Sequence, residues 1–253
     1  MKLYEICFSP TGGTKKAADL LAKALREDAV WVDLADSKTD PSKIQLTGED
    51  IAVIEVPCYG GRAPKTAVER ILAIQGGGAG AVLVCAYGNR AYEDTLAELQ
   101  DTVQKAGFSV IAGVAVVAEH SIVRRYAAGR PNEEDARLLT EFAARIRDKI
   151  ASGKKDCPKI PGNRPYKKTA EIGIVPKATA ACVGCGICAQ MCPVQAIDPE
   201  NPKKVSRKAC ISCMRCVSAC PHGARKVNPL MIFAVSLALK RVCSEQKGCE
   251  LFL

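Results

Sequence analysis

The first 150 residues alternate short apolar runs with longer segments in which apolar residues recur every three or four positions. The short runs predict strands at residues 2–9, 30–33, 51–57, 81–86 and 109–117. The longer segments predict helices at residues 14–26, 65–74, 92–105 and 132–151. Strands that alternate with helices indicate a parallel sheet covered on both faces. We therefore expect residues 1–152 to form a doubly wound α/β domain with five parallel strands.

The pattern changes after residue 152. Residues 153–178 are rich in Lys, Pro and Gly and show little periodicity, which is typical of a linker. Residues 179–228 contain eight of the fourteen cysteines. This stretch is short enough for a small α+β domain.

The last part, residues 229–253, begins with the helix-start pair Asn228 and Pro229, which predicts a helix over residues 229–243 followed by a tail. The apolar run at 230–239 is shorter than the roughly 20 residues that a membrane span needs. We therefore expect no membrane-spanning segment.

The eight cysteines of residues 179–228 form two copies of one spacing, C-x2-C-x2-C-x3-C-P. This spacing is the pattern of bacterial two-cluster ferredoxins, in which the last cysteine of each run ligates the other cluster. We therefore expect two 4Fe-4S clusters. The first would be held by Cys182, Cys185, Cys188 and Cys220. The second would be held by Cys192, Cys210, Cys213 and Cys216.

Two other uses of cysteine fit the sequence less well. Structural zinc requires two CxxC pairs about 15–20 residues apart, whereas each run here has two consecutive CxxC steps, then a CxxxC step, and its own Cys-Pro end. A disulfide framework requires an oxidising compartment. The N-terminus, MKLYEICFSP, lacks the apolar core of a signal peptide and predicts a strand. We therefore expect a cytoplasmic protein.

Positive charge is concentrated in the second half of the chain. Residues 1–150 hold 19 Lys and Arg against 21 Asp and Glu, and residues 151–253 hold 17 against 6. A basic block can bind nucleic acid, but aromatic residues make up only 5% of the chain and do not alternate with the basic ones. We expect no nucleic-acid binding. The charge would instead partly neutralise the clusters. The remaining Lys and Arg would either steer an acidic redox protein partner or form a solvated surface without a specific role.

Three loops rich in Gly, Tyr and hydroxyl residues follow predicted strands, at the edge where open α/β sheets bind ligands. The first, SPTGGTK at residues 9–15, combines glycines for a tight turn with three hydroxyls and the start of a helix. Such a loop can bind an anion through backbone N–H groups and the helix dipole. It lacks the GxGxxG and GxxxxGK[ST] motifs.

The segment SPTGGTKKAADLLAKAL resembles the [ST]-x-T-G-x-T opening of flavodoxins, whose loop binds the phosphate of FMN. The resemblance implies phosphate contacts from Ser9, Thr11, Gly12, Gly13 and Thr14. Flavodoxins are commonly acidic and often stack a Trp on the flavin. This chain departs from that pattern, because this half is nearly neutral and its one Trp, Trp31, lies in a predicted strand away from the loops.

The same resemblance implies that the loops at 57–64 and 87–94 enclose the isoalloxazine ring of FMN. The implied contacts are Pro57, Cys58, Tyr59, Gly60, Gly61, Ala86, Tyr87, Gly88, Asn89, Tyr92 and Asp94. Tyr59, Tyr87 and Tyr92 are all candidates for stacking on the ring. Asp94 also fits an acidic helix start, and His120 fits either a proton donor to the flavin or a surface residue.

Taken together, the two halves resemble the flavodoxin–ferredoxin fusions of anaerobes, a type of iron–sulfur flavoprotein. The resemblance implies electron transfer among FMN, two clusters and a redox protein partner, coupling one- and two-electron chemistry. The alternative is a flavin-dependent reductase of a small molecule, to which the clusters supply electrons. A homodimer that pairs the flavin of one subunit with a cluster of the other also fits the sequence.

Overall fold

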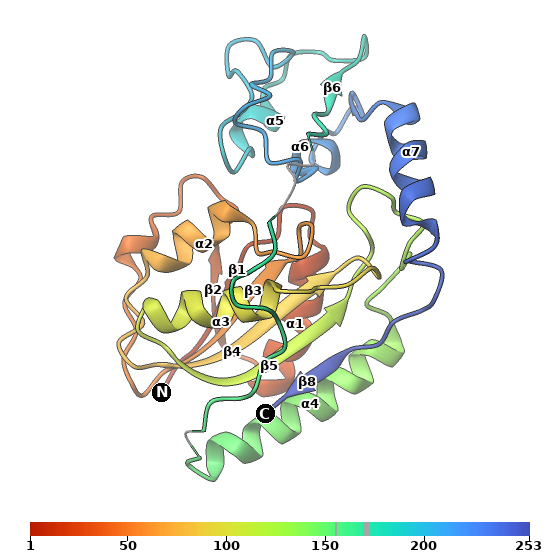
Figure 1. The fold of residues 1–253 in the computed structure, drawn as a ribbon. Coiled ribbons are helices and arrows are strands. Elements are labelled where there is room, and N and C mark those ends of the chain that lie inside the picture. Colours follow the sequence, from red (N-terminus) through yellow and green to blue (C-terminus); the bar gives the residue numbers. More distant parts are fainter. Residues whose placement is uncertain (155, 169–172) are drawn as a thin grey trace.

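The computed structural model describes residues 1–154, 156–168 and 173–253 (Figure 1). Five parallel strands form its central sheet in the order β2-β1-β3-β4-β5. They are β1 (Leu3–Cys7), β2 (Ala29–Asp33), β3 (Ile51–Pro57), β4 (Gly80–Tyr87) and β5 (Ser109–Val117). This is the flavodoxin-like strand order of doubly wound sheets, and it confirms the predicted fold class.

Helices cover both faces of the sheet. On one face, α1 (Gly13–Leu25) and α4 (Glu133–Ala151) bury Leu21 and Leu139 against valines of β3, β4 and β5. On the other face, α2 (Lys65–Leu72) and α3 (Thr95–Lys105) bury Ile71 and Leu99. A short 3-10 turn, η1 (Pro41–Lys43), follows β2. Because β4 is buried along its whole length, the sequence there is a continuous apolar run.

A sixth strand, which the sequence pattern did not predict, extends the sheet beyond β5. The C-terminal strand β8 (Glu250–Phe252) pairs antiparallel with β5, and Leu251 lies opposite Val114. Residues from the far end of the chain therefore complete the edge of the α/β domain.

The cysteine-rich region has little regular structure, as its size and composition predict. A two-stranded antiparallel ladder joins β6 (Lys177–Ala178) to β7 (Arg225–Lys226). The two short helices α5 (Ile187–Gln190) and α6 (Arg215–Ser218) each lie within one cysteine run. This gives the small α+β unit that the spacing predicted.

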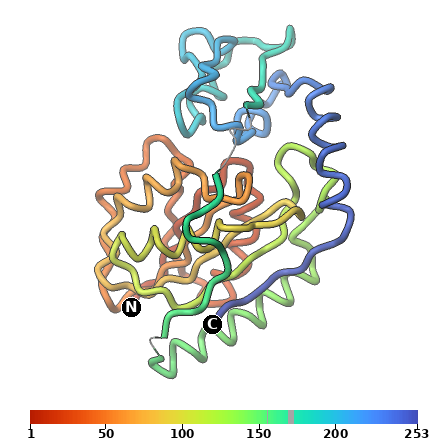
Figure 2. The backbone as a smooth tube through the Cα atoms, viewed as in Figure 1, coloured from red at the N-terminus to blue at the C-terminus, as the bar shows by residue number. Residues whose placement is uncertain are grey.

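The path of the chain ties the cysteine-rich region to the sheet on two sides (Figure 2). On one side, residues 157–168 pack along the α/β domain: the backbone N–H groups of Asn163 and Lys167 each donate to the carboxylate of Asp94 at 2.7 Å. On the other side, α7 (Pro229–Lys240) leads into a tail that ends in β8. The predicted helix at 229–243 therefore ends three residues early. No helix within the described residues is both long enough and apolar enough to cross a membrane.

Candidate cofactor sites

The eight motif cysteines surround two separate cavities in the cysteine-rich region. One, here called the outer cysteine cavity, is lined by Cys182, Cys185, Cys188 and Cys220. The other, here called the inner cysteine cavity, is lined by Cys192, Cys210, Cys213 and Cys216. These are the same two sets into which the ferredoxin spacing divides the cysteines. Within the described part of the chain, no His, Cys, Asp or Glu residues form a group of three that would hold a single metal ion.

The two cavities are built in the same way. The last cysteine of each run accepts a backbone hydrogen bond from four residues further on: Ala196 N donates to Cys192 Sγ and Ala224 N donates to Cys220 Sγ, each at 3.3 Å. Such N–H groups stabilise a thiolate ligand. Since each run contributes three cysteines to one cavity and its last to the other, a ligand in either cavity would cross-link both runs.

Burial favours the protonated form of three inner cysteines by raising the pKa of Cys210, Cys213 and Cys216. It raises the pKa of Cys213 to about 11 and the pKa of Cys216 to about 12. Thiolate ligation there requires a metal that displaces the proton, as iron does in a cluster. The donor set of sulfur atoms therefore fits iron–sulfur chemistry.

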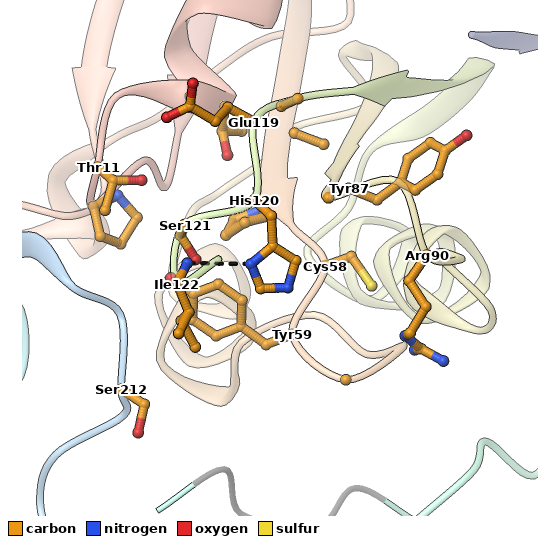
Figure 3. Close-up of a pocket in the computed structure, with 18 of the residues that line it drawn as sticks. Thr11, Cys58, Tyr59, Tyr87, Arg90, Glu119, His120, Ser121, Ile122 and Ser212 are labelled. Carbon is orange, nitrogen blue, oxygen red and sulfur yellow. Dashed lines mark hydrogen bonds between the residues drawn. The ribbon is translucent and has the colours of Figure 1, made fainter. Parts of the chain in front are cut away.

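A third cavity, here called the loop-edge cavity, lies at the carboxyl ends of the parallel strands (Figure 3). The loops after β1, β3, β4 and β5 all contribute to it. Ten of the residues expected to contact FMN line it: Thr11, Gly13, Thr14, Pro57, Cys58, Tyr59, Gly60, Ala86, Tyr87 and Gly88. The hydroxyl-rich loop and the two Tyr-Gly loops thus meet around one space.

The loop after β1 is shaped to leave its hydroxyl and N–H groups at this cavity. Gly12 adopts the left-handed conformation at φ 87°, which favours glycine, and α1 begins directly after it without a side-chain cap. The hydroxyl of Ser9 accepts a hydrogen bond from Lys15 N at 2.9 Å. Ser9 therefore fixes the loop from outside the cavity, while Thr11 and Thr14 line it.

The three tyrosines have different surroundings. Tyr87 donates from its hydroxyl to Gly248 O at 2.9 Å, and Tyr92 donates to Glu250 Oε2 at 3.0 Å. Their rings also pack edge to face, with centroids 5.3 Å apart. Both side chains therefore hold the C-terminal tail. Tyr59 lines the cavity, and its pKa is raised well above the usual value by burial and by the neighbouring Cys213 of the inner cysteine cavity.

Five further residues expected at the flavin do not line the cavity: Gly12, Gly61, Asn89, Tyr92 and Asp94. Asn89 donates to Cys243 O at 3.0 Å and to Glu245 O at 2.9 Å, so it holds the tail. Asp94 accepts from the segment at 163–167. Gly61 has φ 90°, a left-handed conformation that favours glycine. These side chains shape the loops around the cavity.

His120 lines the loop-edge cavity from the loop after β5 (Figure 3). Its Nδ1 accepts hydrogen bonds from Ile122 N and Val123 N, both at 3.1 Å. Burial lowers the pKa of His120, so the ring is neutral near pH 7 and carries its proton on Nε2. A Cβ at Gly88 would come within 2.7 Å of the imidazole, which explains the glycine at that position.

Several lining residues were not among the predicted flavin contacts: Pro10, Arg90, Ala91, Ala118, Glu119, Ser121, Ile122 and Ser212. The position of the loop after β5 at the same sheet edge is a signal that could have indicated many of them. Ser212 has no such signal, because it belongs to the second cysteine run.

The second cysteine run contacts the α/β domain directly. Ser212, between the cluster-motif residues Cys210 and Cys213, lines the loop-edge cavity, and Ile211 packs against the apolar core beneath the sheet. Arg70 of α2 donates to Pro193 O, the carbonyl after Cys192, at 2.8 Å. The inner cysteine cavity therefore lies next to the loop-edge cavity.

Comparison with known proteins adds a family match for the cysteine-rich region. Residues 181–225 match the model of the 4Fe-4S dicluster domain. No curated protein matches the chain.

Three solved flavodoxins are similar in structure to the α/β domain. A flavodoxin from the domain Archaea is 13% identical with a TM-score of 0.43, covering 60% of this chain and 99% of its own. The Megasphaera elsdenii flavodoxin is 19% identical with a TM-score of 0.41, covering 56% and 98%. A flavodoxin of Streptococcus pneumonia TIGR4 is 22% identical with a TM-score of 0.41, covering 58% and 99%.

The strand order and the dicluster match together define the class of protein. A flavodoxin-like α/β domain is followed by a 4Fe-4S domain. This is the organisation of a flavodoxin–ferredoxin fusion, as the motifs predicted. A flavin-binding fold joined to an iron–sulfur domain is suited to electron transfer.

Proposed function

We propose that the chain binds FMN in the loop-edge cavity and two 4Fe-4S clusters in the cysteine cavities, and that it passes electrons between these cofactors and a redox protein partner. The observation that carries the proposal is the position of Ser212. This residue separates two expected ligands of the inner cluster and also lines the expected flavin site. One short loop therefore contacts both cofactors.

The lining of the loop-edge cavity supports the FMN phosphate at one end and the isoalloxazine ring at the other. Thr11, Thr14 and the start of α1 offer hydroxyl and N–H donors for a phosphate. Tyr59 is the stacking candidate we favour, because the hydroxyls of Tyr87 and Tyr92 bind the C-terminal tail.

When bound, FMN would exchange one or two electrons, whereas each cluster would exchange one. The chain's own residues set the order of transfer. Cys185 of the outer cysteine cavity is exposed, and Val183 beside it is 67% exposed. The inner cysteine cavity faces the α/β domain through Ser212 and Tyr59. We infer that electrons pass between partner and flavin through the outer cluster first and the inner cluster second.

The charge near the outer cysteine cavity favours an acidic protein partner. Pro202 lines that cavity, and the segment that follows it exposes Lys203, Lys204, Arg207 and Lys208. A cluster of positive side chains beside a redox centre raises the rate of encounter with an acidic protein. The same surface would make the reaction with such a partner slower at high salt.

A second function has one observation in its favour. His120 and Arg90 line the loop-edge cavity, and His120 Nε2–H is a donor. A small molecule bound beside the flavin could receive a proton from that group. This arrangement would make the protein a flavin-dependent reductase that the clusters supply with electrons.

An anaerobic titration followed by ultraviolet–visible and EPR spectroscopy tests the proposal. Protein isolated without oxygen should contain about eight irons and one FMN per chain, since each 4Fe-4S cluster holds four irons. Addition of a one-electron reductant should reduce both kinds of cofactor. One or two irons with stoichiometric zinc, or a colourless protein, would contradict the proposal.

A further inference from the structure

Each cysteine cavity contains one buried arginine. Arg225 of β7 is 3% exposed and lines the outer cysteine cavity, and Arg215 of α6 is 9% exposed and lines the inner one. The other basic side chains of residues 181–225 are exposed: Lys203, Lys204, Arg207 and Lys208. The two arginines therefore differ from the solvated charges around them.

A buried guanidinium is costly unless hydrogen bonds and an opposite charge compensate it. Arg225 donates to Pro176 O at 3.1 Å, to Pro202 O, and to Cys188 Sγ at 3.7 Å. Within the described residues it forms no ion pair, and its Nε has no hydrogen-bond partner. Carbonyl groups satisfy some of its donors, but they leave its charge unneutralised.

Arg215 differs in one respect, because it reaches the α/β domain. Its Nη2 lies 3.4 Å from Asp33 Oδ2 at the end of β2. Asp33 is fixed there, since its Oδ1 accepts from Ala35 N at 2.7 Å. In the described part of the chain, the Nε of Arg215 is also without a partner. The carboxylate therefore offsets part of the charge that Arg215 brings to the inner cavity.

We propose that Arg225 and Arg215 are the charge partners of the outer and inner clusters, respectively, and that Asp33 counteracts the second arginine. The inference rests on the proposed function, because it requires clusters in the two cavities. A 4Fe-4S core with its four thiolates carries about two negative charges, and more after reduction. A nearby positive charge stabilises the reduced form and raises the reduction potential. The charge of each arginine would therefore raise the reduction potential of the cluster in its cavity.

The Asp33 contact has a further consequence for the inner cluster. Asp33 belongs to the α/β domain, so its charge acts on Arg215 only while the two parts are docked. In the docked arrangement the Asp33 carboxylate therefore lowers the potential of the inner cluster, which makes that cluster a stronger donor to the flavin beside it.

Substitutions of opposite sign test this inference in the full-length, cluster-loaded protein. Anaerobic EPR-monitored redox titration measures the midpoint potential of each cluster. We expect Arg225→Gln to shift chiefly the outer cluster to a more negative potential, and Arg215→Gln to shift chiefly the inner cluster in the same direction. Asp33→Asn should shift the inner cluster to a more positive potential. Arg241→Gln, which removes an exposed charge at the end of α7, is the matched control and should shift neither.

The lysine variants separate charge from packing. Arg225→Lys and Arg215→Lys keep the positive charge and should leave the potentials close to those of the unaltered protein. If a glutamine variant fails to assemble its clusters, Asp33→Asn still decides the question, because Asp33 lies outside the cysteine loops. A negative shift or no shift in Asp33→Asn would overturn the inference, as would lysine variants that shift as far as the glutamine ones.

The 4Fe-4S signals of the unaltered protein separate a failed role of the arginines from a failed proposed function. Unaltered protein that contains both clusters, together with variants whose potentials do not move, would refute the role of the arginines alone. Unaltered protein without 4Fe-4S signals would refute the proposed function itself.

Discussion

The Asn89 side chain holds the C-terminal tail, and replacing Asn89 with glycine tests that role. The Asn89 side chain donates to Cys243 O at 3.0 Å and to Glu245 O at 2.9 Å, and accepts from Lys247 N at 2.9 Å. The residue is 5% exposed and has φ 63°. Glycine adopts this φ without strain, so Asn89→Gly removes the hydrogen bonds with little change to the local backbone.

The magnitude follows from the number of bonds lost. A typical intramolecular hydrogen bond contributes about 1 kcal/mol net, so loss of three weakens docking of the tail by about 3 kcal/mol. Because about 1.4 kcal/mol is a factor of ten, opening of the tail should become roughly 100-fold more frequent. Asn89→Asp places a carboxylate oxygen against the Cys243 and Glu245 carbonyl oxygens in a buried position, so its effect should be at least as large as that of Asn89→Gly.

Amide hydrogen exchange followed by mass spectrometry measures this opening. In Asn89→Gly, peptides that cover residues 243–253 should exchange roughly 100-fold faster, while those of β3 and β4 keep their protection. Asn201→Gly makes the same substitution on the exposed surface and should leave the tail unchanged. Unchanged exchange of the tail in Asn89→Gly would refute the reasoning. Loss of FMN without faster exchange would instead assign Asn89 to the flavin.

Three further predictions concern the phosphate loop, a buried carboxyl group and the contact between the two parts of the chain. Replacing Thr11 and Thr14 with Val should reduce FMN retained after desalting and leave the iron content unchanged; unchanged flavin absorbance would mean that the loop only starts a helix. Burial and Asp19 raise the pKa of Glu5 to about 8, so its neutral form favours the folded state and stability falls as pH rises from about 4.5 to 8. Glu5→Gln should therefore raise the melting temperature more at pH 8 than at pH 5, and an equal rise at both would contradict the assignment. Arg70→Ala removes the bond to Pro193 O and should slow transfer between inner cluster and flavin in stopped-flow absorbance; an unchanged rate would show that other contacts suffice.

The strands of the sheet could be predicted closely from the sequence. The predicted limits of β3 and β5 agree with the structure, because strands buried on both faces appear as short runs of mainly apolar residues. The strand β8 could not be predicted in this way. It has only three residues, and its partner β5 lies more than a hundred residues earlier in the chain.

The same limit applies to the candidate site. Spacing alone divided the cysteines into the two sets that line the cavities, because three cysteines of each set are close in sequence and the known ferredoxin pattern assigns the fourth to the other run. Asp94 and Tyr92 were expected at the flavin, yet their side chains bind segments 69 to 158 residues away. The contribution of Ser212 likewise depends on how the two parts dock, which no local pattern records.

The rate at which electrons move between clusters and flavin within one chain tests whether the two kinds of cofactor work together. The anaerobic, fully loaded protein is mixed with a limiting one-electron reductant, and cluster and flavin absorbance are followed by stopped-flow spectroscopy. Because the inner cysteine cavity and the loop-edge cavity share the loop at Ser212, the account predicts that the rate of the internal step stays constant when the protein is diluted tenfold. A rate that falls in proportion to protein concentration, or a flavin that the clusters never reduce, would contradict it.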